Sequence, residues 1–301
     1  MNPILALIIA NIIWGMASPI FKFALTNIPP FTLAFIRFFF AGLIFLPMVL
    51  NKWQKLTIRQ WFEIFLVGFF GITINISFFF LGLEKTESIN VPVIASSGPV
   101  FIYLLSIMFL REKPKLKVLV GMLAALAGVL FIILSPLFLE GKKFILGAIE
   151  GNLFILIATF GSVFQTIIGR DVLKKVNSIQ VSAITFLFGS LTFIPFIPKE
   201  FLSWNFSLLN TAGWTGIIFG VFFSSALAYF LFYYGVSKLK AQDVGIFTYI
   251  DPVAAVIVAG PLLHEYPNVF YILGSILIFG GIFWAEGRIH WHPWQRLGKN
   301  S

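Results

Sequence analysis

The sequence has few charged residues and no cysteine. Only 11% of its 301 residues are Asp, Glu, Lys or Arg, whereas 59% are hydrophobic. A soluble domain carries about 25% charged residues, so this chain lacks the polar groups that would cover a water-exposed globular surface. The absence of cysteine excludes disulfide bonds, thiolate metal ligands and a cysteine nucleophile.

Long apolar runs occupy most of the chain instead, and a run of about 20 apolar residues spans a bilayer as a helix. The sequence therefore predicts an all-α polytopic membrane protein. The ten predicted transmembrane helices are Pro3–Leu25, Phe31–Leu50, Trp61–Leu83, Val91–Leu110, Leu116–Leu137, Ile145–Ile168, Ile179–Ile197, Ala212–Val236, Val244–Leu263 and Val269–Trp284.

The net charge of +9 is explained by the loops between these helices. Fifteen Lys and Arg residues fall on one side of the predicted membrane and four on the other. Cytoplasmic loops carry the excess of positive charge, so we expect a multi-pass protein of the cytoplasmic membrane with both termini in the cytoplasm. Basic loops beside anionic lipid account for the charge, and we expect membrane lipid and no nucleic acid as a partner.

The two halves of the chain resemble each other at an offset of 153 residues. The matching positions are of special residue types, which similar composition alone would not align: Gly82/Gly235, Pro99/Pro252, Glu112/Glu265, Pro114/Pro267, Gly121/Gly274 and Gly128/Gly281. We predict two five-helix repeats, 1–140 and 141–288, with 289–301 as a cytoplasmic tail. Because five is an odd number, the second repeat is inverted in the membrane, which is a plan of secondary transporters.

These features together resemble the drug/metabolite transporter superfamily, and its EamA-type permeases and exporters in particular. The resemblance rests on the duplicated five-helix unit, on Trp14-Gly15 in the first helix, on AFIRFFFAGLIFLP in the second, and on the L-x-E-x-P turn after helices 4 and 9. It covers essentially the whole chain. It implies a central cavity surrounded by helices 1, 3, 4, 6, 8 and 9.

Charged residues inside spans are costly and mark candidate sites. Lys22 and Arg37 are candidates for binding an anionic substrate group; alternatively, Lys22 extends to the outer headgroups and Arg37 pairs within the protein. Asp251 is the candidate for proton coupling, or else it pairs with a cytoplasmic Lys. Pro99 and Pro252 are candidate hinges, because proline removes a helical hydrogen bond.

Neutral polar and aromatic side chains complete the predicted substrate site. We expect about half of them to reach the cavity, where they would suit an amphipathic metabolite, and the others to pack between helices. They are Trp14, Ser18, Asn75, Ser96, Ser97, Tyr103, Gln165, Tyr229, Tyr233 and Tyr249.

The stretch LLHEYPN resembles the zinc-protease pattern HExxH, but it does not predict a metal site. Asn268 occupies the position of the second histidine, and Pro267 would interrupt the helix that carries both ligands. The other histidines, His290 and His292, lie on the opposite side of the predicted membrane, so the three cannot form one catalytic site. We expect no enzyme, no metal and no cofactor.

We therefore predict a secondary transporter that moves a small metabolite, an amino acid or a related compound, outward by alternating access. The chain carries no P-loop pattern that would bind ATP as the driver. A transporter of phosphorylated solutes or nucleotide sugars is the alternative, and a membrane-embedded lipid-modifying enzyme is a more distant one. Either a monomer or a homodimer fits the sequence.

Overall fold

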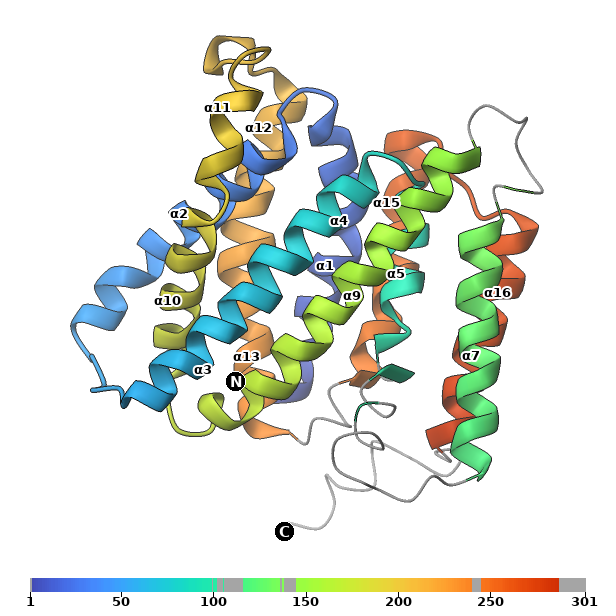
Figure 1. The fold of residues 1–301 in the computed structure, drawn as a ribbon, viewed down its shortest axis with the longest axis horizontal. Coiled ribbons are helices and arrows are strands. Elements are labelled where there is room, and N and C mark those ends of the chain that lie inside the picture. Colours follow the sequence, from blue (N-terminus) through green and yellow to red (C-terminus); the bar gives the residue numbers. More distant parts are fainter. Residues whose placement is uncertain are drawn as a thin grey trace.

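The structure is a computed structural model in which residues 2–98, 100–101, 105, 116–135, 137, 145–239 and 245–286 are described. Within these ranges the protein is a bundle of helices without strands (Figure 1). In the view of Figure 1, α7 (Leu116–Leu134) and α16 (Val269–Glu286) run vertically, whereas α3–α4 (Ile58–Leu83) and α9 (Ile145–Leu173) cross the bundle at a slant. The predicted all-α architecture is confirmed for the described part of the chain.

The helices overlap the predicted spans where the structure describes them, and most of the second half of Val91–Leu110 lies outside the described residues. α1 has the predicted bounds Pro3–Leu25. The remaining elements are α2 (Pro30–Leu50), α3 (Ile58–Gly68), η1 (Phe69–Ile74), α4 (Asn75–Leu83), α5 (Asn90–Ala95), α7 (Leu116–Leu134), α9 (Ile145–Leu173), α10 (Ser178–Leu191), η2 (Ile194–Phe196), α11 (Ile197–Glu200), η3 (Phe206–Leu208), α12 (Thr211–Ile218), η4 (Phe219–Leu227), α13 (Ala228–Lys238), η5 (Gly245–Tyr249), α15 (Ile250–Leu263) and α16 (Val269–Glu286).

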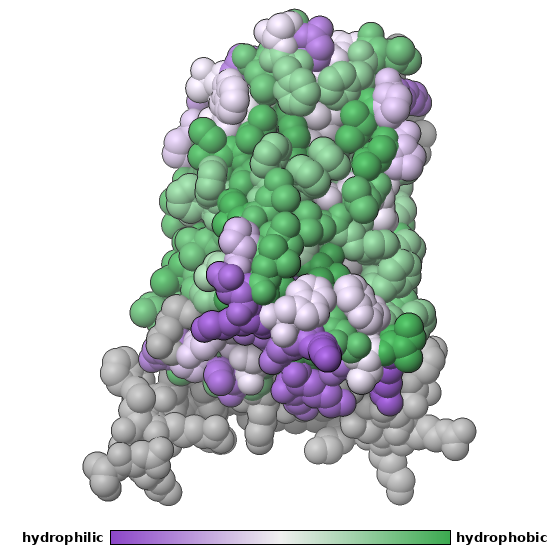
Figure 2. Space-filling model, turned by 90° about the vertical axis from the view of Figure 1, so that its left-hand side faces the viewer, coloured by the Kyte–Doolittle hydropathy of each residue, from purple (hydrophilic) through white to green (hydrophobic). Residues whose placement is uncertain are grey.

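Six helical segments in the described residues are long and apolar enough to cross a bilayer, and three shorter ones are also apolar. Figure 2 shows the corresponding surface, a broad apolar band with polar residues gathered toward its ends. Many large apolar side chains of the helices are exposed, among them Phe62, Leu130 and Ile257. Such a surface is compatible with lipid and not with water, so the chain is a multi-pass membrane protein.

α7 and α16 pack against each other along their length at one edge of the bundle (Figure 1). A Cβ added at Gly128 would lie 2.6 Å from the carbonyl oxygen of Gly274, and one added at Gly281 would lie 2.3 Å from that of Gly121. Small residues allow such close approach of membrane helices. These four glycines therefore allow α7 and α16 to pack closely.

α2 and α10 pack together at the other side of the bundle, and each is capped by the segment that follows its partner. Glu200 accepts hydrogen bonds from the backbone N–H groups of Phe31 (2.9 Å) and Thr32 (2.7 Å) at the start of α2. At the opposite end, Gln54 accepts one from the N–H of Asn177 (2.8 Å), which precedes α10. The two helix starts are thus satisfied in the same reciprocal manner.

Candidate functional site

Arg37 is buried in the middle of the bundle, with 2% of its surface exposed. Its Nε donates a hydrogen bond to the hydroxyl of Ser225 (3.1 Å), and its Nη2 donates one to the hydroxyl of Ser224 (3.0 Å). Both serines belong to η4, which packs against α2. A guanidinium carries five N–H donors, so these two hydroxyls satisfy only part of its hydrogen-bonding capacity.

Aromatic rings enclose the remainder of this guanidinium. Its carbon Cζ lies 4.4 Å from the ring centre of Phe21, 4.6 Å from that of Phe38 and 5.9 Å from that of Phe80. Cation–π contacts of this kind stabilise a cation by about 0.5–2 kcal/mol. Arg37 forms no ion pair with any carboxylate in the described part of the chain. Arg37 is therefore a buried positive charge without a carboxylate partner in the described residues.

Four of the predicted neutral residues continue from this point along the bundle. The indole N–H of Trp14 donates to the carbonyl oxygen of Ser224 (3.1 Å), and the Trp14 ring packs edge-on against Tyr229 at 5.1 Å between centroids. Tyr229 in turn contacts Tyr233 at 5.8 Å, and the Tyr233 hydroxyl accepts a hydrogen bond from Gln165 (2.9 Å). These side chains from α1, α9 and α13 form one connected group with Arg37.

Two π-helical segments border this group. η4 carries the serines that bind Arg37, and η1 approaches Gln165 so closely that a Cβ on Gly71 would lie 2.1 Å from the side-chain carbon Cδ of Gln165. π-helical turns are rare and are frequent at functional sites, because they displace side chains from the ordinary helical register. The site thus lies where α3–α4 and α12–α13 both depart from the α-helix.

A second polar region lies where the predicted fourth and ninth spans are interrupted. α5 ends at Ala95, and the Ser96 hydroxyl that follows donates to the carbonyl oxygens of Pro92 (2.7 Å) and, more weakly, of Thr248 (3.5 Å). Thr248 belongs to η5, which precedes α15. The segments at which the two spans change their helical form are therefore in contact with each other.

Asp251 and Pro252 lie in the first turn of α15. The first four N–H groups of a helix have no intrahelical partner, so the missing N–H of Pro252 leaves no additional group unpaired there. The oxygen Oδ1 of Asp251 is buried and has no hydrogen-bond partner. The predicted hinge proline thus marks a helix start within the span.

At the end of the bundle opposite the N-terminus, Lys22 forms an ion pair with Glu265 (2.9 Å) and donates to the carbonyl oxygen of Thr86. The other oxygen of Glu265 accepts from the N–H (2.7 Å) and the hydroxyl (2.5 Å) of Ser88. His264, in a left-handed conformation at φ 57°, ends α15 and turns the chain toward this network. The network joins α1, the α4–α5 connection and the α15–α16 connection.

The other predicted residues take individual places. The amide of Asn75 donates to the carbonyl oxygen of Ala158 (2.7 Å), which links α4 to α9, and the Ser97 hydroxyl donates to Ile94 (2.6 Å) within its own turn. The ring of Tyr249 packs on Phe279 at 5.4 Å. Ser18 is buried and has no hydrogen-bond partner. Tyr103 and Pro99 lie outside the described residues.

Sequence reasoning did not select Ser224, Ser225, Phe21 or Glu265. The two serines stand in FGVFFSSAL, where adjacent hydroxyls in an apolar run were a detectable signal. Phe21 gave no such signal, because one phenylalanine among the 38 in this chain is not distinguishable by sequence. Glu265 was interpreted as an element of a turn, whereas its carboxylate holds Lys22 and Ser88.

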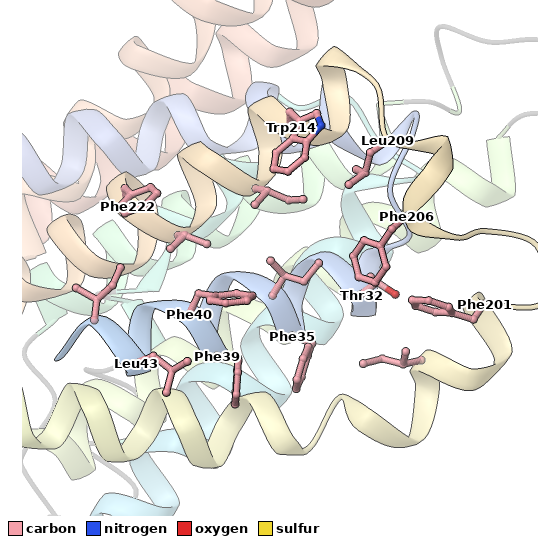
Figure 3. A pocket seen from close by; sticks show the side chains of 15 residues that line it. Thr32, Phe35, Phe39, Phe40, Leu43, Phe201, Phe206, Leu209, Trp214 and Phe222 are labelled. Atoms are coloured by element: carbon pink, nitrogen blue, oxygen red, sulfur yellow. The ribbon is translucent and has the colours of Figure 1, made fainter. Parts of the chain in front are cut away.

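A separate apolar groove of about 810 Å³ lies between α2 and α12–η4 (Figure 3). Phe35, Phe39 and Phe40 line it from α2, while Trp214 and Phe222 line it from the opposite side. Its lining is almost entirely apolar, so it suits hydrocarbon. The described residues contain no group of three or more His, Asp or Glu side chains that could hold a metal ion.

The sequence matches the EamA-like transporter family over residues 1–134 and 149–286. The uncharacterized transporter YetK of Bacillus subtilis is 30% identical over 287 residues, which cover 94% of this chain and 86% of that protein. An uncharacterized transporter of Archaeoglobus fulgidus is 28% identical, covering 90% of this chain and 93% of that one. A crystal structure with 18% identity shares the fold, with a TM-score of 0.65 over 93% of this chain and 96% of its own.

Proposed function

Because the chain belongs to the EamA-like transporter family, we propose that it exports a small metabolite, an amino acid or a related compound, as a secondary transporter. Its family and its apolar helices make it a membrane transporter. The observation that carries the substrate proposal is the buried guanidinium of Arg37, which has no carboxylate partner in the described structure. A substrate carboxylate would supply that partner through charge-assisted hydrogen bonds.

The surroundings of Arg37 favour a carboxylate over a phosphate. Lys22, the second cation considered for the site, is engaged by Glu265 at the end of the bundle. A phosphate monoester carries up to two charges, and the described residues offer it one buried guanidinium. Trp14, Tyr229 and Tyr233 would contact the less polar part of the substrate.

Several contacts support an inverted repeat and alternating access. α2 and α10 cap each other's starts at opposite ends of the bundle. The glycines of α7 pair with those of α16 in antiparallel order, so each helix pair joins one half of the chain to the other in opposite orientation. The matched family segments leave a gap at 135–148, which contains the predicted boundary between repeats 1–140 and 141–288. In this proposal both termini are cytoplasmic, and the Lys22–Glu265 network closes the outer end in the state described.

The test is counterflow in proteoliposomes. The external compounds would be amino acids, carboxylic acids without an amino group, amines without a carboxyl group, sugar phosphates and nucleotides. We expect exchange of compounds that carry a carboxylate. Replacing Arg37 by Gln removes charge-assisted bonds of about 1.5–3 kcal/mol, which corresponds to a loss of about 10- to 150-fold in apparent affinity.

Arg59→Gln is the matched control, because Arg59 is an exposed arginine that pairs with Glu63 in the first turns of α3. It should exchange substrate like the unmodified protein. Exchange of phosphorylated compounds and of no carboxylate would favour the alternative substrate class. Exchange of no compound in the panel, together with turnover in a lipid-enzyme assay, would overturn the transporter proposal for this chain.

A further inference from the structure

Asp251 lies near the middle of the membrane-spanning bundle. A Cβ added at Gly15 would lie 2.4 Å from the carbonyl oxygen of Asp251 and 2.7 Å from its Cα. Gly15 lies near the middle of α1, which has 23 residues. At a rise of about 1.5 Å per residue, Asp251 is therefore far from both ends of α1, at the depth where an isolated carboxylate is most costly.

The face of α1 that meets α15 is polar. Asn11, Gly15, Ser18 and Lys22 are spaced by four, three and four residues, so they form one stripe along the helix. Asn11 and Ser18 are buried, with 0% and 2% of their surfaces exposed. The oxygens Asn11 Oδ1, Ser18 Oγ and Asp251 Oδ1 are all buried without a hydrogen-bond partner. Buried polar atoms without a partner in the described structure require an explanation.

The interrupted spans add backbone oxygens to the same region. α15 packs against α1, α5 and η5, and the Ser96 hydroxyl at the end of α5 meets the Thr248 carbonyl three residues before Asp251. Coupling ions of transporters bind where discontinuous helices meet near the midplane, because unwound carbonyls and helix C-termini attract cations. The chemistry of this place is that of a cation site.

The charges nearby do not neutralise an ionised Asp251. On the elements packed against α15, the titratable or charged side chains in the described structure are Lys22, which is paired with Glu265, and Tyr249 on η5. The N-terminal dipole of α15 favours a carboxylate by about 0.3–1 kcal/mol in most settings. A charged residue at the bilayer centre costs about 2.5–3.5 kcal/mol on insertion scales. The helix dipole alone is therefore too weak to offset the cost of an ionised Asp251 at this depth.

We propose that Asp251 is the proton-binding site that couples export of the substrate to the proton gradient. This inference rests on the proposed function. In the protonated state the carboxyl group is neutral and provides an O–H donor for an acceptor on the facing stripe of α1. The carboxylate takes up one proton from the outer side and releases it to the cytoplasm, while substrate moves outward.

The test separates exchange from accumulation. Proteoliposomes are given an equimolar mixture of the twenty standard amino acids, and transported compounds are measured by mass spectrometry with and without a pH gradient. In Asp251→Asn we expect accumulation driven by the pH gradient to fall by about tenfold or more, the effect of 1.4 kcal/mol or more of lost driving force. Counterflow without a gradient should fall much less. Glu63→Gln, a carboxylate-to-amide change on the exposed pair with Arg59, should retain both.

A second measurement needs no substrate. Infrared difference spectra of the purified protein in lipid nanodiscs, recorded between acidic and basic buffer, should show a protonated carboxyl band that is absent from Asp251→Asn. Asp251→Glu should restore a shifted band and part of the gradient-driven accumulation.

Each contrary result has its own meaning. Equal loss of counterflow and accumulation in a folded Asp251→Asn protein, or accumulation driven by a sodium gradient in place of a pH gradient, would overturn the proton proposal. Absence of the Asp251-dependent band would overturn it as well. If the mixture is not exchanged at all but the band is present, the proposed substrate class fails while the protonation site stands.

Discussion

Replacing Glu265 by Gln is expected to open the end of the bundle that carries the Lys22–Glu265 pair, which is the outer end in the proposed topology. The Glu265 carboxylate binds Lys22 at 2.9 Å and accepts two hydrogen bonds from Ser88. A hydrogen bond to a charged group contributes about 1.5–3 kcal/mol when buried. The side chains of Lys22 and Glu265 are 27% and 12% exposed, and glutamine retains part of the bonding. We therefore expect a net loss of about 2 kcal/mol, or roughly 30-fold in the ratio of open to closed states.

The assay uses the absence of native cysteine. Ser18→Cys places a single thiol at a buried position one helical turn below Lys22, and a membrane-impermeant thiosulfonate is added from outside. If modification follows the open fraction, Glu265→Gln should raise its rate by about 30-fold. Ser207→Cys, in an exposed connection at the same end, reports the intrinsic rate of the reagent.

Glu63→Gln in the Ser18→Cys protein serves as the charge-matched control, since Glu63 pairs with Arg59 away from this network. A rate that rises less than about threefold in Glu265→Gln, when about 2 kcal/mol corresponds to about 30-fold, would refute the reasoning. An equal rise in Glu63→Gln would refute it too, because the effect would then follow from lost charge anywhere on the protein.

Two further predictions concern stability. Gly281→Ala should lower the melting temperature, because the added Cβ would lie 2.3 Å from the carbonyl oxygen of Gly121. The control is the neighbouring Gly280→Ala, whose Cβ meets nothing within 4 Å and which should be neutral or stabilising by about 0.5–1 kcal/mol. Equal melting temperatures of the two variants would contradict this prediction. Burial, followed by the charge of Glu200, raises the pKa of Glu84 above its ordinary value, so the wild type loses stability as pH rises through that pKa. Glu84→Gln lacks this loss, and thermal unfolding across a pH series should show the two proteins converging at low pH.

The spans could be predicted because the bilayer imposes one simple rule on the sequence. The apolar run of Pro3–Leu25 coincides with α1, and the run of Trp61–Leu83 differs from the described helical segment by three residues at its start. The interruption in Val244–Leu263 was not predicted, because the change from η5 to α15 at Ile250 occurs inside an apolar run. Only Asp251 and Pro252 signalled it.

The site was harder to predict than the spans, because its residues acquire their roles from partners far away in the sequence. Arg37 was selected because its charge is conspicuous in a span, but the serines and rings that hold it lie on three other segments. Lys22 had the same conspicuous charge, and the structure engages it with Glu265, 243 residues away. Charge identifies candidates, while packing decides which of them retain an unpaired charge.

The placement of Arg37 and Asp251 indicates how the two groups would communicate. Trp14 and Gly15 are adjacent on α1, and they contact different neighbours: Trp14 donates to Ser224, which holds Arg37, whereas Gly15 contacts Asp251. A shift of α1 that follows protonation of Asp251 would therefore act directly on the serines that orient the guanidinium. Coupling then requires no long pathway, since one rigid helix contacts both sites at the same depth and carries Lys22, the partner of Glu265, in its last turn.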